Sequence, residues 1–257
     1  MIIDERKIKR LAYNWGEEFN KVVNKFGYNP DINGTHEDIW TTGGTLTRLS
    51  SAETMSVVST STADDTGGTG AITIQIEGID NNWDILNESV TLNGTGAVTT
   101  TGSFLRINRM FITSSGSGQT NAGKITASSA GTVQAAIEIG SGQTEKTQYA
   151  VPRNYRVIFT ELQVNTNDNA GLEGLFVMNE NNKGWRIKRR IFFTAGDVRI
   201  SMYGEYADEK TDVKVTAKSL TGSNKLVAAD YTFYLMRKHS WLNTSLYLFK
   251  VKTTYGQ

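Results

Sequence analysis

The 257-residue chain contains no cysteine, only 2 prolines and only 2 histidines. Without cysteine it forms no disulfide, no thiolate metal site and no cysteine nucleophile. His36 and His239 lie far apart in the sequence, and His36 has no second histidine close by with which to bind a metal. No G-x-S-x-G motif marks a serine nucleophile. We therefore expect no catalytic residue, no metal site and no cofactor, and a chain that is not an enzyme.

The sequence also lacks long apolar runs and a large net charge. No run approaches the roughly 18 apolar residues of a membrane-spanning helix, so no membrane partner is expected. The formal net charge is +1, which gives no overall attraction to nucleic acid. The charge is uneven, because residues 28–150 are acidic and residues 151–257 are basic. Two interpretations stay open: attraction between copies in an assembly, or two solvated surfaces of different composition.

Short apolar runs separated by turn residues predict a mainly β chain. The 25 glycines, with many threonines, serines and asparagines, supply the turns. Alternating or β-branched segments predict strands, among them Ala71–Ile79, Ser103–Ile112, Arg156–Asn165 and Trp185–Phe193. Turn signals about every ten residues predict two β-sandwich domains, of jelly-roll or Ig-like type. We place them at residues 28–143 and, with a C-terminal extension, 144–257. One continuous sandwich with long loops is the alternative.

The first 27 residues have a different pattern. Apolar residues recur there at spacings of three, four and seven, which predicts an amphipathic α-helix preceding the two β domains. Asp4 fits the N-cap position and Gly27 the position just after the helix. The helix either packs on its own domain or anchors the chain to a partner. For the second case we predict an interface of Ile8, Leu11, Trp15, Phe19, Val22 and Phe26.

The segment Gly118–Lys124 (GQTNAGK) matches the start of the phosphate-binding pattern G-x-x-x-x-G-K-[ST]. Ile125 stands where a hydroxyl should bind Mg²⁺, and the residues that follow do not predict a helix. We therefore interpret the segment as a hairpin loop. Asp64, in the separate glycine-rich stretch at residues 64–70, is likewise explained by turn chemistry.

Residues 183–190 (KGWRIKRR) form the one dense basic run. In a regular strand Trp185 and Ile187 would share one face, while Arg186, Lys188 and Arg190 would share the other. We predict a second partner interface at these three basic residues. The partner there would be an acidic protein or, less favoured, nucleic acid, and a plain solvated surface is the alternative to an interface.

Residues 33–112 carry a family resemblance. The strings NGTHEDIWTTGGTLT and AITIQIEGIDNNWDILNESVTLNGTGAVTTTGSFLRINRMFI resemble β-rich structural proteins in the virions of tailed bacteriophages of marine bacteria and cyanobacteria. The stretch YAVPRNYRVIFTEL resembles the opening of the second β-domain in such proteins. The shared pattern is G-x-D-x-x-W, then S-x-x-x-x-L-N-G-T, then L-R-I-N-R. It falls on Gly78, Asp80, Trp83, Ser89, Leu92–Thr95 and Leu105–Arg109.

The resemblance implies a location in the virion, with other virion proteins as partners and a homo-oligomer as the expected state. The first hypothesis is a tail-associated structural protein, such as a ring, connector or fibre-attachment element. The second is a capsid decoration protein. The third is a carbohydrate-binding module that recognises a surface glycan, with Trp40, Trp83 and Trp185 as its candidate contacts.

Overall fold

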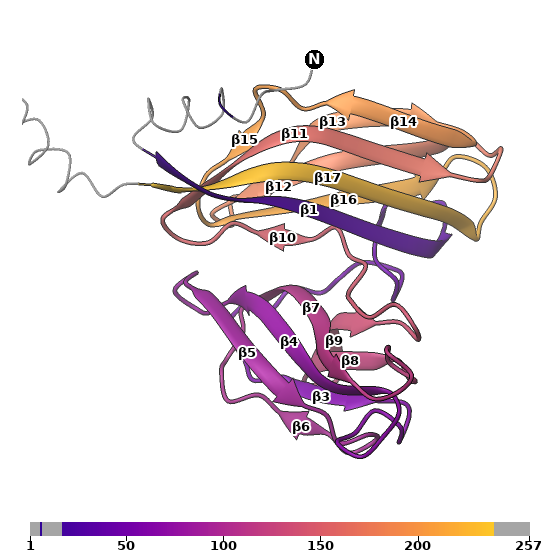
Figure 1. The fold of residues 1–257 in the computed structure, drawn as a ribbon. Coiled ribbons are helices and arrows are strands. Elements are labelled where there is room, and N and C mark those ends of the chain that lie inside the picture. Colours follow the sequence, from indigo (N-terminus) through magenta and orange to yellow (C-terminus); the bar gives the residue numbers. More distant parts are fainter. Residues whose placement is uncertain (1–5, 7–16, 239–257) are drawn as a thin grey trace, which may run out of the picture.

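The computed structural model describes residue 6 and residues 17–238, and within residues 17–238 the regular elements are β-strands (Figure 1). The prediction of a mainly β chain is confirmed. No helix in the described residues is long and apolar enough to cross a membrane. The strands are β1 Glu17–Ile32, β2 Glu37–Asp38, β3 Ser56–Ser59, β4 Ala71–Ile79, β5 Ile85–Thr91, β6 Val98–Thr99, β7 Arg106–Ser115, β8 Ile125–Ser129, β9 Thr132–Ile137, β10 Tyr149–Ala150, β11 Tyr155–Thr166, β12 Leu172–Glu180, β13 Trp185–Phe193, β14 Gly196–Ser201, β15 Tyr206–Ala207, β16 Thr211–Ser219 and β17 Lys225–Lys238.

Ten strands, β1, β2 and β10–β17, form what we call the larger body, the upper part of Figure 1. One of its sheets has the order β1-β17-β11-β14, with β15 also paired to β11. The other has the order β10-β16-β12-β13, with β2 also paired to β16. Inward-facing residues of both sheets form one hydrophobic core. Buried and partly buried residues alternate along most of β17 and along the second half of β11, with the period of two that a half-buried strand requires.

Aromatic rings fill the centre of this core. The Phe159 ring lies 5.1 Å from that of Phe176, edge to face, and 5.8 Å from those of Tyr231 and Phe233. All four side chains are almost fully buried. The edge-to-face arrangement is the one that aromatic quadrupoles favour, so these rings contribute more than their buried area alone.

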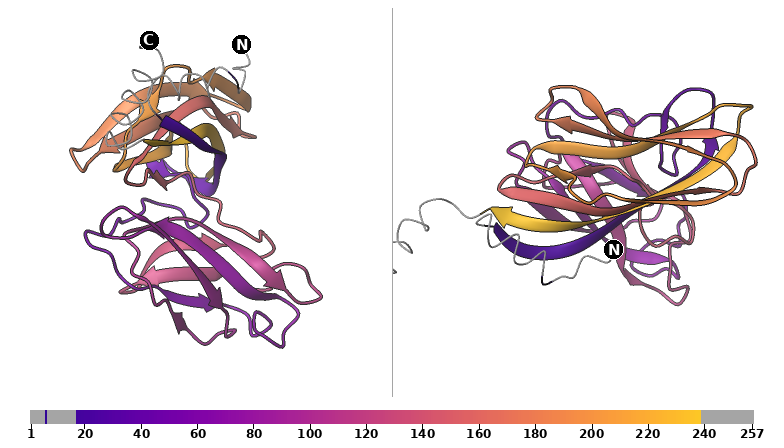
Figure 2. Two further views of the ribbon diagram at one scale, coloured as in Figure 1. Left: turned by 60° about the vertical axis from the view of Figure 1, so that its left-hand side comes forward. Right: turned by 90° about the horizontal axis from the view of Figure 1, so that it is seen from above.

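The seven strands β3–β9 form what we call the smaller body, the lower part of Figure 1. Its sheets have the orders β6-β3-β8-β9 and β5-β4-β7. They share a second core of aliphatic residues with one ring, Phe104. Figure 2 shows the two bodies as separate stacked units joined by short connections.

The predicted helix is wrong for residues 17–26, which belong to strand β1. Of the preceding residues of that prediction only residue 6 is described, and the rest lie outside the described residues. β1 pairs in antiparallel register with β17, from Glu17 opposite Lys238 to Ile32 opposite Lys225. A register shift between Phe19 and Lys21 makes Asn20 an extra residue. Such a bulge lets residues three apart share a face of a strand, which is the spacing that mimicked a helix.

The finer prediction of two jelly-roll or Ig-like sandwiches is not confirmed, because the strands form four small sheets whose connectivity is different. The first and last described strands are neighbours, and β2 pairs with β16. Residues 28–38, which the prediction assigned to the first domain, therefore pair with strands of the second. Pairing across some 200 residues leaves no local signal in the sequence.

Candidate functional site

The segment LRINR, Leu105–Arg109, at the start of β7 in the smaller body, contacts the larger body. The Arg106 Nε donates to Asp212 Oδ1 of β16 at 3.0 Å, and Nη1 donates to the Leu49 carbonyl at 2.8 Å. Arg48 pairs with the same carboxylate of Asp212, which is 6% exposed. One buried carboxylate of the larger body thus binds two guanidinium groups, that of Arg106 on the smaller body and that of Arg48 on the segment between β2 and β3. Such a charge-assisted arrangement has strict geometry.

Asn108 provides a second contact between the two bodies. Its Nδ2 donates to the Ala150 carbonyl at 3.0 Å, and its Oδ1 accepts from the Ala150 amide at 2.7 Å. The side chain therefore pairs with β10 as a neighbouring strand would. The Asn108 carbonyl accepts a hydrogen bond from Lys25 Nζ of β1 at 2.6 Å. Asn108 thus contacts both sheets of the larger body.

The G-x-D-x-x-W pattern forms the turn between β4 and β5, which is a third contact. Asp80 Oδ1 accepts from the amides of Asn82 and Asp84, at 2.8 and 2.9 Å. The turn holds Trp83 at φ 66°, and its carbonyl accepts from the Arg153 amide at 2.7 Å. Asp84 completes the contact through an ion pair with Arg153 at 2.6 Å.

Gly78, in the same pattern, is required by close packing. A Cβ atom there would lie 2.2 Å from the Arg106 carbonyl oxygen, a distance that backbone atoms cannot relax. Two parts of the pattern, G-x-D-x-x-W and L-R-I-N-R, therefore contribute contacts between the bodies, and Gly78 lets β4 and β7 of the smaller body pack closely. We call this set of contacts the junction.

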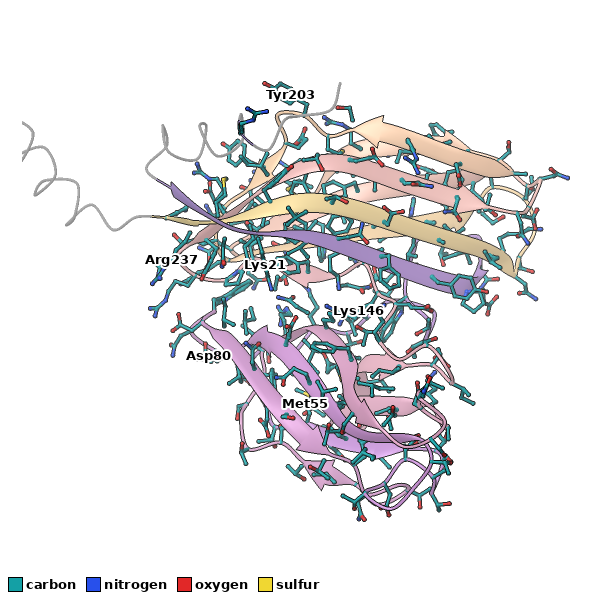
Figure 3. All side chains as sticks on the ribbon, viewed as in Figure 1. Lys21, Met55, Asp80, Lys146, Tyr203 and Arg237 are labelled. Atoms are coloured by element: carbon teal, nitrogen blue, oxygen red, sulfur yellow. The ribbon has the colours of Figure 1, made fainter. Side chains whose placement is uncertain are left out.

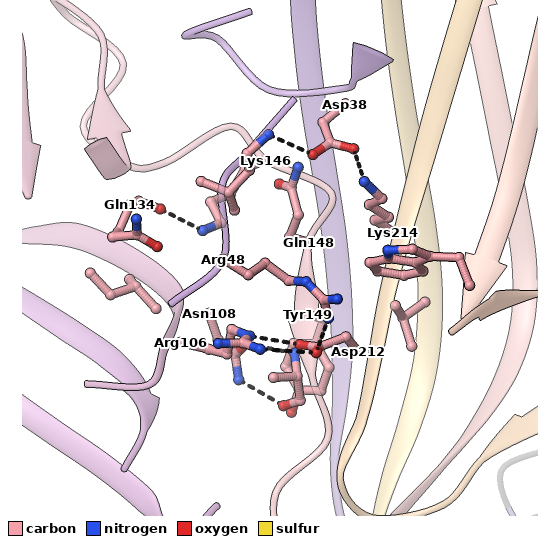
Figure 4. A pocket seen from close by; sticks show the side chains of 15 residues that line it. Asp38, Arg48, Arg106, Asn108, Gln134, Lys146, Gln148, Tyr149, Asp212 and Lys214 are labelled. Carbon is pink, nitrogen blue, oxygen red and sulfur yellow. Dashed lines mark hydrogen bonds and ion pairs between the residues drawn. The ribbon is translucent and has the colours of Figure 1, made fainter. Parts of the chain in front are cut away.

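A small polar cavity of about 20 Å³ lies within the junction (Figure 4). Asp38 accepts from the Leu46 amide at 2.9 Å and pairs with Lys214 at 2.5 Å. The Gln148 amide has no hydrogen-bond partner among the described residues, although both of its polar atoms are buried. A cavity of this size holds about one water molecule, which a buried amide can bind.

Two lysines are buried at the junction, and Figure 3 shows Lys146 between the bodies. Burial lowers the pKa of Lys146 to about 7, against the opposing attraction of Asp38. Its Nζ donates to the Gln134 carbonyl at 2.9 Å. Burial, with repulsion from Lys146 and Arg109, holds the pKa of Lys25 well below its usual range. At the junction, protonation of Lys25 and Lys146 is therefore coupled to the packing that buries them.

The residues predicted from the helical stripe are only partly described. Ile8, Leu11 and Trp15 lie outside the described residues. Phe19, Val22 and Phe26 lie opposite Met236, Tyr234 and Asp230 of β17. Because β17 residues two and four apart share a face, these three positions of β1 lie on one face of the sheet. Val22 is 51% exposed and Phe26 is partly buried.

The basic run forms most of β13, but its three predicted interface residues do not share a face. A register shift leaves Lys188 as an extra residue between Ile187 and Arg189. Arg190 therefore lies on the face of Trp185 and Ile187, opposite to Arg186. Arg186 and Lys188 each pair with Glu180, at 3.6 and 3.5 Å, and Arg190 pairs with Glu173. Carboxylates of the same chain, Glu180 and Glu173, thus balance the positive charges of these three residues.

Two amide groups of the Gly118–Lys124 loop donate hydrogen bonds to a carboxylate of the chain. Asp64 accepts from the amides of Ala122 and Gly123 at 2.8 and 2.9 Å, from that of Ala71 at 2.7 Å, and from the Ser59 hydroxyl at 2.5 Å. Asp64 is fully buried, so the interpretation of Asp64 as a simple turn residue is wrong. Among the described residues no group of three or more His, Cys, Asp or Glu side chains could hold a metal ion.

Sequence reasoning missed Asp212, Asn108, Lys25 and Lys146 as residues of the junction. One signal was present: Arg106, Asn108 and Arg109 interrupt an otherwise apolar strand. Polar residues inside a buried strand indicate a specific contact, although they do not identify the partner.

No protein-family model and no curated protein matches the chain. Among solved structures it is similar to a structure of the infectious bursal disease virus Gx strain, at 9% identity and a TM-score of 0.27, over 88% of this chain and 74% of that one. A structure of the T13 particle of the same virus matches at 7% identity and a TM-score of 0.22, over 87% of this chain and 75% of that one. At TM-scores this low the likeness carries no argument about fold or function.

Proposed function

We propose that the chain is a structural subunit of a virus particle, which acts through protein–protein contacts and catalyses no reaction. The observation that carries this proposal is the junction. Its contacts come from the motif that resembles virion proteins of tailed bacteriophages, and they fasten Arg106 to Asp212 and Asn108 to Ala150. A subunit of a symmetric assembly must present its surfaces at fixed angles, which polar contacts of strict geometry provide.

Within that role we propose a tail-associated position, as a ring, connector or fibre-attachment element, in a homo-oligomer with neighbouring virion proteins. Exposed apolar side chains on the larger body support a role in contacts: Ile187 is 51% exposed and Phe192 63% exposed on β13. β13 is also an edge strand, with β12 as its one partner among the described strands. Edge strands with exposed apolar residues are suited to contact another chain.

The experiment is quantitative mass spectrometry of purified particles, with the copy number of this chain measured against known head and tail proteins. A tail ring predicts about six or twelve copies, whereas a decoration protein would be present in hundreds, by the symmetry of such assemblies. Absence of the chain from purified particles would contradict the structural role itself.

A matched pair of variants tests the part played by the junction. Asn108→Ala should reduce incorporation into particles, because it removes both hydrogen bonds to Ala150. Lys124→Ala, on the smaller body, removes only a partly exposed ion pair with Glu138 and should incorporate normally.

A further inference from the structure

A cleft of about 580 Å³ lies between β1 of the larger body and the β5-β4-β7 sheet of the smaller body. Volumes of this order are typical of sites that bind ligands. In Figure 3, Lys21 on β1 and Asp80 at the β4–β5 turn lie on opposite sides of the gap between the bodies. The charged and exposed apolar side chains that line the cleft are those of Lys21, Val22, Lys25, Glu77, Ile85 and Arg109.

Both strands that border the cleft are sheet edges. β1 pairs with β17 alone among the described strands, and β5 pairs with β4 alone. Residues Asn20 to Phe26 of β1 all line the cleft, so the unpaired backbone edge of this strand borders it. An unpaired edge offers alternating amide and carbonyl groups, to which an extended peptide can add as a further strand.

The charged groups of the cleft are mostly positive. Lys21, Lys25 and Arg109 face one carboxylate, that of Glu77. Among the described residues Lys21 has no ion-pair partner, and Arg109 donates to the neutral Gln143 Oε1 at 2.8 Å. Burial, with repulsion from Lys146 and Arg109 and against the attraction of Glu77, holds the pKa of Lys25 well below its usual range. The attraction of the cleft for an anion therefore comes chiefly from Lys21 and Arg109.

The cleft also exposes apolar side chains on its opposite walls. Val22 on β1 is 51% exposed and Ile85 on β5 is 46% exposed. An occupant that covers both must itself carry apolar side chains. Since side chains of a strand alternate between faces, an extended segment can present acidic and apolar residues in turn.

We propose that this cleft binds an extended acidic segment of a partner protein, which adds as a strand to the free edge of β1. The inference rests on the proposed function, in that the partner is another protein of the assembly. Charge complementarity selects the partner, backbone pairing with β1 orients it, and Val22 and Ile85 bind its apolar side chains.

The test uses a fluorescein-labelled peptide of alternating valine and aspartate, with a valine–lysine peptide of equal length as its counterpart. Fluorescence polarisation with the full chain should show binding of the aspartate peptide, at least about tenfold tighter than the lysine peptide and weakened by salt. The aspartate peptide N-methylated at every second residue, made in both registers, should lose binding in one register. Equal binding of the two charge forms, or no binding of the aspartate peptide, overturns the proposal.

Variants locate the site. Lys21→Glu and Arg109→Glu should each lower the affinity for the aspartate peptide by about tenfold. Lys183→Glu, which changes an exposed lysine outside the cleft, should leave this affinity unchanged. Sedimentation identifies the competing occupant: self-association of the wild-type chain that Lys21→Glu abolishes would mean that a second copy fills the cleft, and would overturn the proposal. Peptide binding is independent of particle incorporation, so failure of the cleft and failure of the structural role can be told apart.

Discussion

The core of the larger body and the junction are both buried, but they are built from opposite chemistry. The core packs the rings of Phe159, Phe176 and Tyr231, whose contacts depend on shape and area. The junction joins Arg106 to Asp212 and Asn108 to Ala150 through directional bonds. Apolar burial supplies most of the stability of a body, whereas directional polar contacts fix one geometry at a smaller net gain. We therefore expect the cores to determine stability and the junction to determine the relative orientation of the two bodies.

The largest effect is expected in the core. Phe159→Ala should lower the free energy of unfolding by about 4 kcal/mol, because it leaves a cavity where three rings now meet. Chemical denaturation followed by tryptophan fluorescence measures this loss. Phe192→Ala, which removes an exposed ring, is the matched control and should have little effect. Equal losses for the two variants would contradict the described core.

The second-largest loss of stability is expected when a buried polar contact inside the smaller body is removed. Asp64→Ala should cost about 3 kcal/mol, because it leaves three amides, two of them buried, and the Ser59 hydroxyl without their acceptor. Denaturation of the variant should show the loss in the transition of the smaller body. Asp65→Ala, next to it but partly exposed, should cost far less. A near-neutral Asp64→Ala would show that this polar cluster does not stabilise the fold.

The buried lysines give the junction a pH dependence at lower pH than the range in which the core tyrosines ionise. Lys146 has a pKa of about 7 in the folded chain, and an unfolded lysine has one of about 10.4. Between these values the unfolded chain binds more protons, so the free energy of unfolding should rise with pH; below pH 7 this contribution is constant. Lys25 acts in the same direction.

Measurements from about pH 7.5 to 9.5 isolate this rise. Above that range Tyr149 and Tyr231, whose pKa values burial raises, oppose it, because the unfolded chain then loses their protons first. Lys146→Met should reduce the increase of the unfolding free energy with pH. Lys124→Met, which changes a partly exposed ion pair, should leave that increase unchanged. The same slope in both variants would mean that Lys146 is not the group responsible.

The smallest effect is expected at the loop that resembles a phosphate-binding motif. Lys124→Ala should change stability by less than about 0.5 kcal/mol, because its ion pair with Glu138 is partly exposed. Isothermal titration of the wild-type chain with a nucleoside triphosphate and Mg²⁺ should show no binding, since Asp64 occupies the loop amides. Measurable binding that Lys124→Ala removes would overturn this interpretation.

Local strand patterns in the sequence predicted much of the fold. The predicted strands Ala71–Ile79 and Trp185–Phe193 are the observed β4 and β13, and the predicted Arg156–Asn165 lies within β11. Each has the alternation or β-branched content that a half-buried strand needs, which is a property of the segment itself.

What the sequence could not predict depends on distant pairing or on single extra residues. β1 was predicted as a helix because the bulge at Asn20 gives Phe19 and Val22 a helix-like spacing. The bulge at Lys188 moves Arg190 to the other face of β13. The junction joins Arg106 to a carboxylate 106 residues away, and no local pattern marks such a partner.

We expect the junction to fix the angle between the bodies without providing most of their stability. The cysteine-free chain allows two spin labels to be placed alone, at Thr91→Cys on the smaller body and Lys183→Cys on the larger body, both exposed. Electron–electron resonance should give one narrow distance distribution in the labelled parent chain. Adding Asn108→Ala or, independently, Asp212→Asn should broaden it while the denaturation of the two cores stays close to that of the parent. A distribution that stays narrow in both folded variants would contradict the account.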